Sequence, residues 1–446
     1  MKFPKKPPPL ERFFREPKGM FSAMDKAGEE AARRDRYLHW DELRHRKPPE
    51  GLTVEDWWFG LKMRRLAQRQ HIPLGDRKGS LFSFWLSPRM FERLHDIDLK
   101  CGGSVEGPEP VKNPDTRDRY YVSSLVEEAI TSSQLEGAAV TRSVAKEMLR
   151  SGRRPTGTGE QMILNNFLTM RQISKWKKGD LTPELVMEMH RMITRETLED
   201  RSHEGRLRNA DEPVRVEDDQ TGEIFHVPPP AEELPGRLQA MCDFANDTKM
   251  EGYLHPVIRS IILHFWLAYD HPFVDGNGRT ARAIFYWSML RHKFWLFEFI
   301  SISQTILEAP VQYYRAFLHT ETDDNDLNYF LLHQLEVISK AICQLHEYIR
   351  QKADELVKMQ ALLHNRSGFN HRQLALLRHA LKHPSVSFTV ASHQNSHNVV
   401  AQTSRNDLDE LCGHGLLLKV KVGKAYRYRP LENLSEKLER MTSGEK

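Results

Sequence analysis

The segment from His271 to Arg282 reads His-Pro-Phe-Val-Asp-Gly-Asn-Gly-Arg-Thr-Ala-Arg and concentrates residues that handle phosphate groups. Gly276, Asn277 and Gly278 stand directly before a helical pattern. Small residues at the start of a helix let backbone N–H groups point at a phosphate, which the positive end of the helix also attracts. The loop therefore predicts an anion cradle.

Charged side chains on both sides of this cradle complete the set. Arg279 and Arg282 are three residues apart on the first turn of the predicted helix, so we expect both guanidinium groups to face one polyphosphate. Asp275 supplies the carboxylate that Mg²⁺ prefers when the ion also binds nucleotide oxygens. His271 lies at the end of the preceding helix, where a neutral imidazole can take a proton from an incoming hydroxyl. The combination predicts phosphoryl or nucleotidyl transfer.

Helical periodicity dominates the sequence on both sides of this segment and predicts a mainly α fold. We expect helices over residues 121–135, 142–149, 160–176, 183–197, 230–246, 255–269 and 278–290. Residues 214–227 are the exception, because two β-prone runs flank a polar turn that contains Gly222, which predicts a β-hairpin. The aromatic run at 79–86 fits either a strand or a buried connector.

The two ends of the chain differ from this core. Residues 1–78 are rich in Lys, Arg and Pro, with an amphipathic helix over 52–70, and predict a basic extension. After a long linking helix, helices at 372–382, 389–395 and 400–411 precede strands at 416–420 and 425–428 that turn at Gly423. This order is typical of a winged helix-turn-helix. We therefore expect four parts: 1–78, a helical region at 79–200, the main domain at 201–345, and 346–446.

Composition narrows the class of protein further. The net charge of +4 is too small to imply a polyanion partner for the whole chain of 446 residues. Four cysteines without a Cys-x-x-Cys pair argue against a disulfide framework or a structural zinc site. We find neither an apolar run of roughly 18 residues nor the apolar core of a secretory signal, and therefore expect a cytoplasmic protein without a membrane partner.

The segment from His271 to Arg282 resembles the Fic family signature, His-x-Phe-x-(Asp/Glu)-Gly-Asn-Gly-Arg-x-x-Arg, at every defined position. The resemblance implies a protein adenylyltransferase, which moves AMP from ATP onto a Ser, Thr or Tyr hydroxyl of a target protein. It implies that His271 is the general base, that Asp275 holds Mg²⁺, and that the loop from Gly276 to Gly278 stabilises charge on the phosphates. Phe273 is then a core anchor.

The resemblance also reaches the hairpin and a later tyrosine. Ile224, Phe225 and His226 belong to a segment similar to the Fic flap, which clamps a target peptide by strand addition along 214–227 and covers the nucleotide. Tyr313 resembles a tyrosine that borders the adenine pocket. Glu321 departs from the asparagine that some relatives carry at that place, so base recognition on this side stays open.

Ser132, Glu136 and Gly137 resemble the inhibitory motif (Ser/Thr)-x-x-x-Glu-(Gly/Asn) of the same family. The resemblance implies that Glu136 pairs with Arg282 and occupies the guanidinium that grips the γ-phosphate of ATP. The inhibition would be intramolecular. Formation of a homodimer and self-modification both stay open as ways to relieve the inhibition. Removal of AMP by means of the same glutamate stays open as a further activity.

Two alternatives to an adenylyltransferase remain. The first is a DNA-binding regulator whose Fic core senses nucleotide: the predicted wing is basic, whereas Asp407, Asp409 and Glu410 on the preceding helix oppose a phosphate backbone. The second is a phosphotransferase, against which Gly278 argues because the phosphotransferase relative Doc has a lysine there. The basic residues of the wing are Lys419, Lys421, Lys424, Arg427 and Arg429.

Overall fold

The computed structural model describes residues 2–14, 25–26, 37–102, 114–217, 221–246, 252–364, 369–382, 386–397, 399–422 and 425–443. The chain forms two compact units, Met1–Leu345 and His346–Lys446. The fold is mainly helical, as predicted. The division into four parts remains a prediction. Of the helices in the described ranges, none combines the length and the apolar character that crossing a membrane requires.

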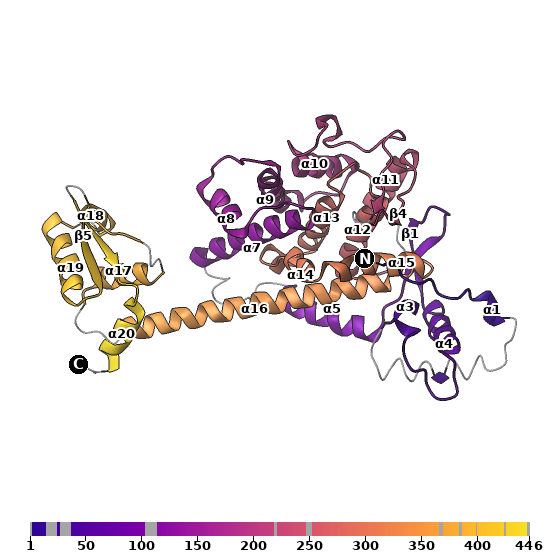
Figure 1. Ribbon diagram of the computed structural model, residues 1–446, viewed down its shortest axis with the longest axis horizontal. Coiled ribbons are helices and arrows are strands. Elements are labelled where there is room, and N and C mark those ends of the chain that lie inside the picture. The colour runs from indigo at the N-terminus through magenta and orange to yellow at the C-terminus, as the bar shows by residue number, and fades with distance from the viewer. Residues whose placement is uncertain are drawn as a thin grey trace. The chain divides into compact units, whose positions relative to one another are not determined.

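The middle of the larger unit is a set of packed helices (Figure 1). The loop that holds the signature joins α12 (Pro256–Asp270) to α13 (Asn277–Arg291), and both helices are almost entirely buried. Against them pack α7 (Pro114–Leu135), α9 (Thr158–Trp176), α10 (Pro183–Thr194) and α11 (Leu234–Ala245). One hydrophobic cluster joins α7 and α9 to α8 (Arg142–Ser151). The end of α7, which carries Ser132, is thereby fixed beside α13.

Local sequence explains where these helices begin and end. Thr182 caps α10 by accepting a hydrogen bond from the Leu185 N–H, and Pro183 fits the first turn because it has no N–H to satisfy. The helix expected over 183–197 ends at Thr194, because Glu196 adopts a positive φ of 59°. The helix expected from residue 230 starts as a 3₁₀ turn, Ala231–Glu233, before α11.

Three two-stranded antiparallel sheets accompany the helices. The run at 79–86 contains a strand, β2 (Leu81–Phe84), which pairs with β1 (Gln70–Gly75) and buries its aromatic side chains. The predicted flap hairpin consists of β3 (Val216–Glu217) and β4 (Ile224–His226), with Val216 opposite His226. Residues 218–220, which belong to its turn, lie outside the described residues.

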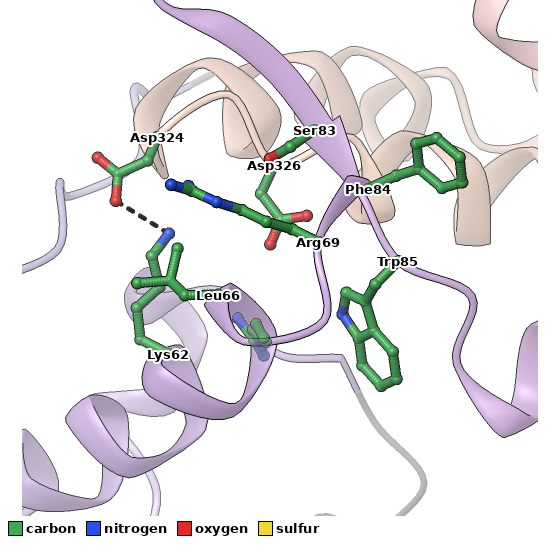
Figure 2. A pocket seen from close by; sticks show the side chains of 9 residues that line it. Lys62, Leu66, Arg69, Ser83, Phe84, Trp85, Asp324 and Asp326 are labelled. Atoms are coloured by element: carbon green, nitrogen blue, oxygen red, sulfur yellow. Dashed lines mark ion pairs between the residues drawn. The ribbon is translucent and has the colours of Figure 1, made fainter. Parts of the chain in front are cut away.

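The N-terminal segment packs into the larger unit. The prediction of a basic extension did not include this packing. Helices α3 (Trp40–Leu43) and α4 (Val54–Leu66) share a hydrophobic cluster, and α1 (Glu11–Phe14) precedes them. The buried Lys62 ammonium lies 2.5 Å from Asp323. It also lies 3.0 Å from Asp324, as the dashed line in Figure 2 marks. The pocket beside this pair measures about 10 Å³, room for one water at most. Buried charges are stable only when paired, so these contacts hold α4 to the loop before α16.

The larger unit contains further helices in addition to those named above. They are α5 (Pro88–Cys101), α14 (Ile302–Glu308), α15 (Pro310–Thr322) and α16 (Asn328–His364), with 3₁₀ turns at Arg201–His203 and Trp295–Glu298. Helices α14 and α15 were not predicted from the sequence as separate helices.

In the described residues of the C-terminal unit, the end of α16 is followed by three helices, a hairpin and a last helix. They are α17 (His371–Lys382), α18 (Val390–His397), α19 (Ala401–Gly413), β5 (Leu417–Val422), β6 (Ala425–Pro430) and α20 (Leu434–Ser443). A core of leucines with Tyr428 holds them together. The order of elements agrees with the predicted order, while the turn at Gly423 and Lys424 lies outside the described residues. The identification as a winged helix stays a prediction.

Candidate active site

His271 ends α12 in a left-handed backbone conformation, with φ of 45° and ψ of 57°. Its Nδ1 lies 3.3 Å from the Ala268 carbonyl, so in the neutral ring Nδ1–H donates there and Nε2 keeps its lone pair. Burial, and after it the charge of the nearby His226, lowers the pKa of His271 to about 4. The ring is therefore neutral at pH 7 and able to accept a proton.

The loop after His271 is held by one asparagine and one aromatic stack. The Asn277 side chain accepts a hydrogen bond from the Phe273 N–H at 3.0 Å and donates to the Phe273 carbonyl at 2.8 Å. The Phe273 ring is fully buried and stacks on His190 at 3.7 Å, which confirms its role as a core anchor. Gly276 has a φ of 84°, and a Cβ there would lie 2.6 Å from the Thr194 side chain. Only glycine fits this turn.

His190 of α10 supports the loop and was not predicted from the sequence as a site residue. Its Nδ1 accepts a hydrogen bond from the Gly205 N–H at 3.0 Å, so its proton is on Nε2, which donates to the Asp275 carbonyl at 2.8 Å. Burial lowers the pKa of His190 to about 4, which keeps the ring in this neutral form. The partners lie 15 and 85 positions away in the chain, so no local pattern points to them.

Asp275 and Arg279 occupy the outer side of the loop. The Asp275 side chain is 56% exposed and lies 3.4 Å from the Arg279 guanidinium, which is buried and also reaches the Ile193 carbonyl at 3.3 Å. The described residues contain no group of three or more His, Cys, Asp or Glu side chains that could hold a metal ion. Asp275 is therefore an exposed carboxylate at the outer side of the loop.

Arg282 points in a different direction from Arg279, so the two guanidinium groups have different neighbours. Its Nε donates to the Ser132 hydroxyl at 2.8 Å, and a second nitrogen donates to the Ser132 carbonyl at 2.9 Å and to Glu136 at 2.8 Å. Burial alone would raise the pKa of Glu136, but Arg282 and then Arg279 outweigh this effect and leave the pKa below its ordinary value. Glu136 is therefore ionised, and the pair is a charged one.

The end of α7 presents Glu136 to the cradle. Gly137 has a φ of 88°, which ends the helix directly after the motif. A Cβ built on Gly278 would collide with the Glu136 carboxylate. Glu136 therefore fills the space beside the first turn of α13, where the anion cradle was predicted.

A pocket of about 450 Å³ brings most of the predicted residues together. Its walls come from the signature loop, α7, the flap and α15. Asp275, Gly276, Arg279, Ile224, Ser132 and Gly137 are not among its lining residues. Those that line it include His271, Asn277, Gly278, Arg282, Glu136, Phe225, His226 and Tyr313.

The flap is fastened to this pocket through His226. Its Nε2 lies 2.7 Å from the Tyr269 carbonyl and its Nδ1 lies 2.8 Å from the Glu321 carboxylate, so both ring nitrogens face acceptors. Burial opposes protonation, but Glu321 and the two hydrogen bonds leave the pKa of His226 above its ordinary value. Glu321, the position at which this chain departs from some relatives, is therefore the partner of the flap histidine.

Two further side chains complete the wall. The Tyr313 hydroxyl lies 2.9 Å from Nε2 of the buried His264, so its polar end is engaged within the core. Arg208 donates from Nε to the His271 carbonyl at 3.0 Å and from its guanidinium to the Pro229 carbonyl at 2.5 Å. Arg208 thus joins the catalytic loop to the end of the flap. Its role also went unpredicted, because its partners are distant in sequence.

The fold and the pocket define a helical protein with a glycine-containing loop at the start of α13. Residues 180–289 match the model of the Fic/DOC family. This chain therefore contains a Fic/DOC domain within these residues.

Relatives and solved structures agree with this family. The chain is 29% identical over 207 residues to a protein adenylyltransferase Fic of Nematostella vectensis, covering 45% of this chain and 44% of that protein. It is 31% identical over 131 residues to the protein adenylyltransferase fic-1 of Caenorhabditis briggsae, covering 29% and 23%. The chain thus spans less than half the length of these relatives.

A Fic family protein from Desulfovibrio desulfuricans G20 aligns with a TM-score of 0.51 at 19% identity. The alignment covers 78% of this chain and 97% of that chain. At this level of identity the similarity concerns the fold, which confirms the predicted mainly α, Fic-type core.

Proposed function

We propose that this chain is a protein adenylyltransferase that transfers AMP from ATP to a Ser, Thr or Tyr hydroxyl and is held inactive by Glu136. The observation that carries the proposal is the pocket in which a neutral His271, the glycine loop and Arg282 meet. The names of the relatives support the same reaction.

His271 would act as the general base. Its Nε2 takes the proton of the target hydroxyl while the hydroxyl oxygen forms a bond to the α-phosphorus of ATP. The bond between the α-phosphorus and the oxygen that bridges to the β-phosphorus breaks, and pyrophosphate leaves. The Ala268 carbonyl, which accepts the Nδ1 proton, fixes the tautomer that this step requires.

The cradle would stabilise the charge of the phosphates. The N–H groups at the start of α13 are oriented by the Asn277 bonds and the left-handed Gly276. Mg²⁺, when bound with the nucleotide, neutralises phosphate charge, and the exposed Asp275 carboxylate is the residue that would hold it.

Glu136 would restrain this machinery. Its carboxylate lies against Gly278 and takes one of the Arg282 hydrogen bonds, so a γ-phosphate that needs Arg282 would meet a negative charge instead. Activity would then depend on withdrawal of Glu136. We propose two routes by which the inhibition by Glu136 could be relieved, namely self-modification and formation of a homodimer. Removal of AMP from a modified protein, with Glu136 taking part, would be a further activity of the site.

The target would lie along the flap. Strand addition to a two-stranded hairpin supplies backbone hydrogen bonds without strong side-chain selection. His226 fastens the flap to the carbonyl of Tyr269, two positions before His271. A segment docked on the flap would therefore lie close to the base. We place this reaction in the cytoplasm.

Labelling with ATP that carries radioactive phosphorus in either the α or the γ position tests the reaction. Transfer of the α label to protein by Glu136→Gly, abolished when His271→Ala is added and retained when the exposed control His95→Ala is added, supports adenylyl transfer. Transfer of the γ label alone would make the chain a phosphotransferase, and no transfer by any variant, Glu136→Gly included, would refute an enzyme of either kind.

The C-terminal unit carries a second candidate function, contact with DNA. Asp407, one of the acids that would repel phosphates, points inward, where it accepts hydrogen bonds from Arg372 at 2.7 Å and from Asn370 at 2.8 Å. Lys421, Arg427 and Arg429 are exposed on the hairpin. A gel shift with duplex DNA that weakens steeply with salt, and that Arg427→Gln reduces, supports this function. Absence of a shift at low salt removes it.

A further inference from the structure

A second cavity, as large as the catalytic pocket, lies on the other side of α15. Its volume is about 450 Å³, and no part of the proposed reaction uses it. Its walls come from the segment before α3, from α3, and from α5, α15 and α16. The lining residues that matter for the argument are Glu42, Arg89, Arg93, Arg315, His319 and His333.

The cavity is rich in arginine. Arg89, Arg93 and Arg315 line it against only two carboxylates, those of Glu42 and Glu336. The Arg93 guanidinium is paired, since it lies 2.9 Å from Glu336. Within the described ranges, Arg315 has neither a hydrogen-bond partner nor an ion-pair partner. Arginine presents a planar set of donors that matches carboxylate and phosphate groups, so the cavity suits an anion.

Two imidazoles that line the cavity, the buried His319 of α15 and the half-buried His333 of α16, each have a ring nitrogen without a hydrogen-bond partner among the described residues. His319 is 6% exposed and stacks on His39 at 4.2 Å, yet its Nε2 has no hydrogen-bond partner among the described residues. The same holds for Nδ1 of His333. Burial lowers the pKa of His319 to about 3 and that of His333 to about 4, so both rings are neutral at pH 7. Buried polar atoms normally have hydrogen-bond partners, so both nitrogens could serve a ligand in the cavity.

Helix α15 separates this cavity from the catalytic pocket. Gln312 and His319 each lie three or four positions from Arg315 and from Ala316, and all four residues line the second cavity. Tyr313, Tyr314, Phe317, Leu318 and Glu321 lie on the other side of the helix and line the catalytic pocket. This spacing assigns the two sets to opposite helix faces. A ligand in the second cavity would therefore touch the helix that holds Glu321 against the flap.

We propose that this cavity binds a small, multiply charged organic or inorganic anion through Arg315 and its neighbouring arginines, and is an effector site. Carboxylate and phosphate groups share the chemistry that the arginines recognise. The segment from Tyr37 to Glu42 forms one wall, so the docked N-terminal region is part of the site. The proposal does not depend on the proposed transfer reaction.

Calorimetric titration of the full chain with citrate and, separately, with inorganic phosphate tests the proposal and distinguishes the two sources of charge. We expect saturable binding of at least one probe, weakened about tenfold or more by Arg315→Gln and by Arg89→Gln, because a hydrogen bond between charged groups is lost. The control Arg64→Gln, an exposed arginine of α4, should bind like the unmodified chain.

Two results would overturn the proposal. One is absence of saturable binding of both probes up to about 10 mM, an order of magnitude above the usual range for metabolites. The other is binding that neither Arg315→Gln nor Arg89→Gln changes, which would place the anion elsewhere, for example at the signature loop. Thermal unfolding of each variant verifies that it folds. No ATP is present in these titrations, so their failure is distinct from a failure of the transfer reaction.

Discussion

Glu136 and Arg282 are separated by 146 positions in the chain and meet at 2.8 Å beside the phosphate loop. Arg282 is 2% exposed, and the hydroxyl and carbonyl of Ser132 take its other hydrogen bonds. The guanidinium is therefore fixed by one helix end before any nucleotide arrives. This relationship makes the proposed enzyme a restrained one, and it yields graded predictions.

Ser132→Ala should weaken the restraint without abolishing it. The substitution removes the hydroxyl that accepts from Arg282 Nε, while the Ser132 carbonyl and Glu136 remain. Loss of one such bond corresponds to about a tenfold effect. We expect transfer of the α label to rise, but less than in a Glu136 variant. Activity equal to that of the unmodified chain would show that Ser132 does not contribute.

Gly278→Ala should reveal the contact with Glu136 through stability. The added methyl group collides with the Glu136 carboxylate, so the substitution should lower the melting temperature of the unmodified chain and lower it less in a Glu136→Gly background. Gly236→Ala, at a helical position with open space around it, is the control and should have the same effect in both backgrounds. Equal losses for Gly278→Ala in both backgrounds would contradict the contact.

The His226–Glu321 pair should make stability depend on pH. Because the pKa of His226 is raised in the folded state, its contribution is complete below the unfolded pKa of about 6.5 and is lost as pH rises through the folded pKa. Glu321→Gln should therefore cost about 1 kcal/mol in urea unfolding at pH 6 and less at pH 8.5. Glu223→Gln, an exposed change beside the same strand, should show no such trend. A cost that grows with pH would contradict the charged pair.

His271 should titrate far below an ordinary histidine. Burial lowers its pKa to about 4, so the neutral base is present above that pH and is lost below it. NMR titration of the ring in the unmodified chain should show a midpoint near 4. A midpoint near 6.5 would mean that the ring is solvated, and that the buried geometry does not hold in solution.

The local part of this site was predictable from sequence, because it lies in one continuous segment. The loop from His271 to Arg282 places the base, the cradle and both arginines within twelve residues, and glycines at positive φ leave a sequence signal. The expected helices around it were found because their apolar spacing is regular. The shared direction expected for Arg279 and Arg282 was wrong, since α13 is buried on both sides and each guanidinium finds its own carbonyl acceptor.

The parts that escaped prediction depend on contacts between distant segments. His190, Arg208 and the Lys62 pair are single polar residues whose partners come from other elements, and no periodicity marks them. Glu321 appeared only as a departure from relatives. Its function as the partner of His226 required the flap and α15 to be brought together in space.

The most direct test of the restrained enzyme is the intact mass of proteins after incubation with Mg-ATP and a cell lysate, comparing the unmodified chain with Glu136→Gly. Glu92→Gly, which makes the same change at an exposed helix position, is the matched control. We predict that proteins gain the mass of one AMP with Glu136→Gly, at least about tenfold more than with the unmodified chain or Glu92→Gly. Equal AMP gain by all three would contradict the restraint, and a gain of one phosphate would contradict the reaction.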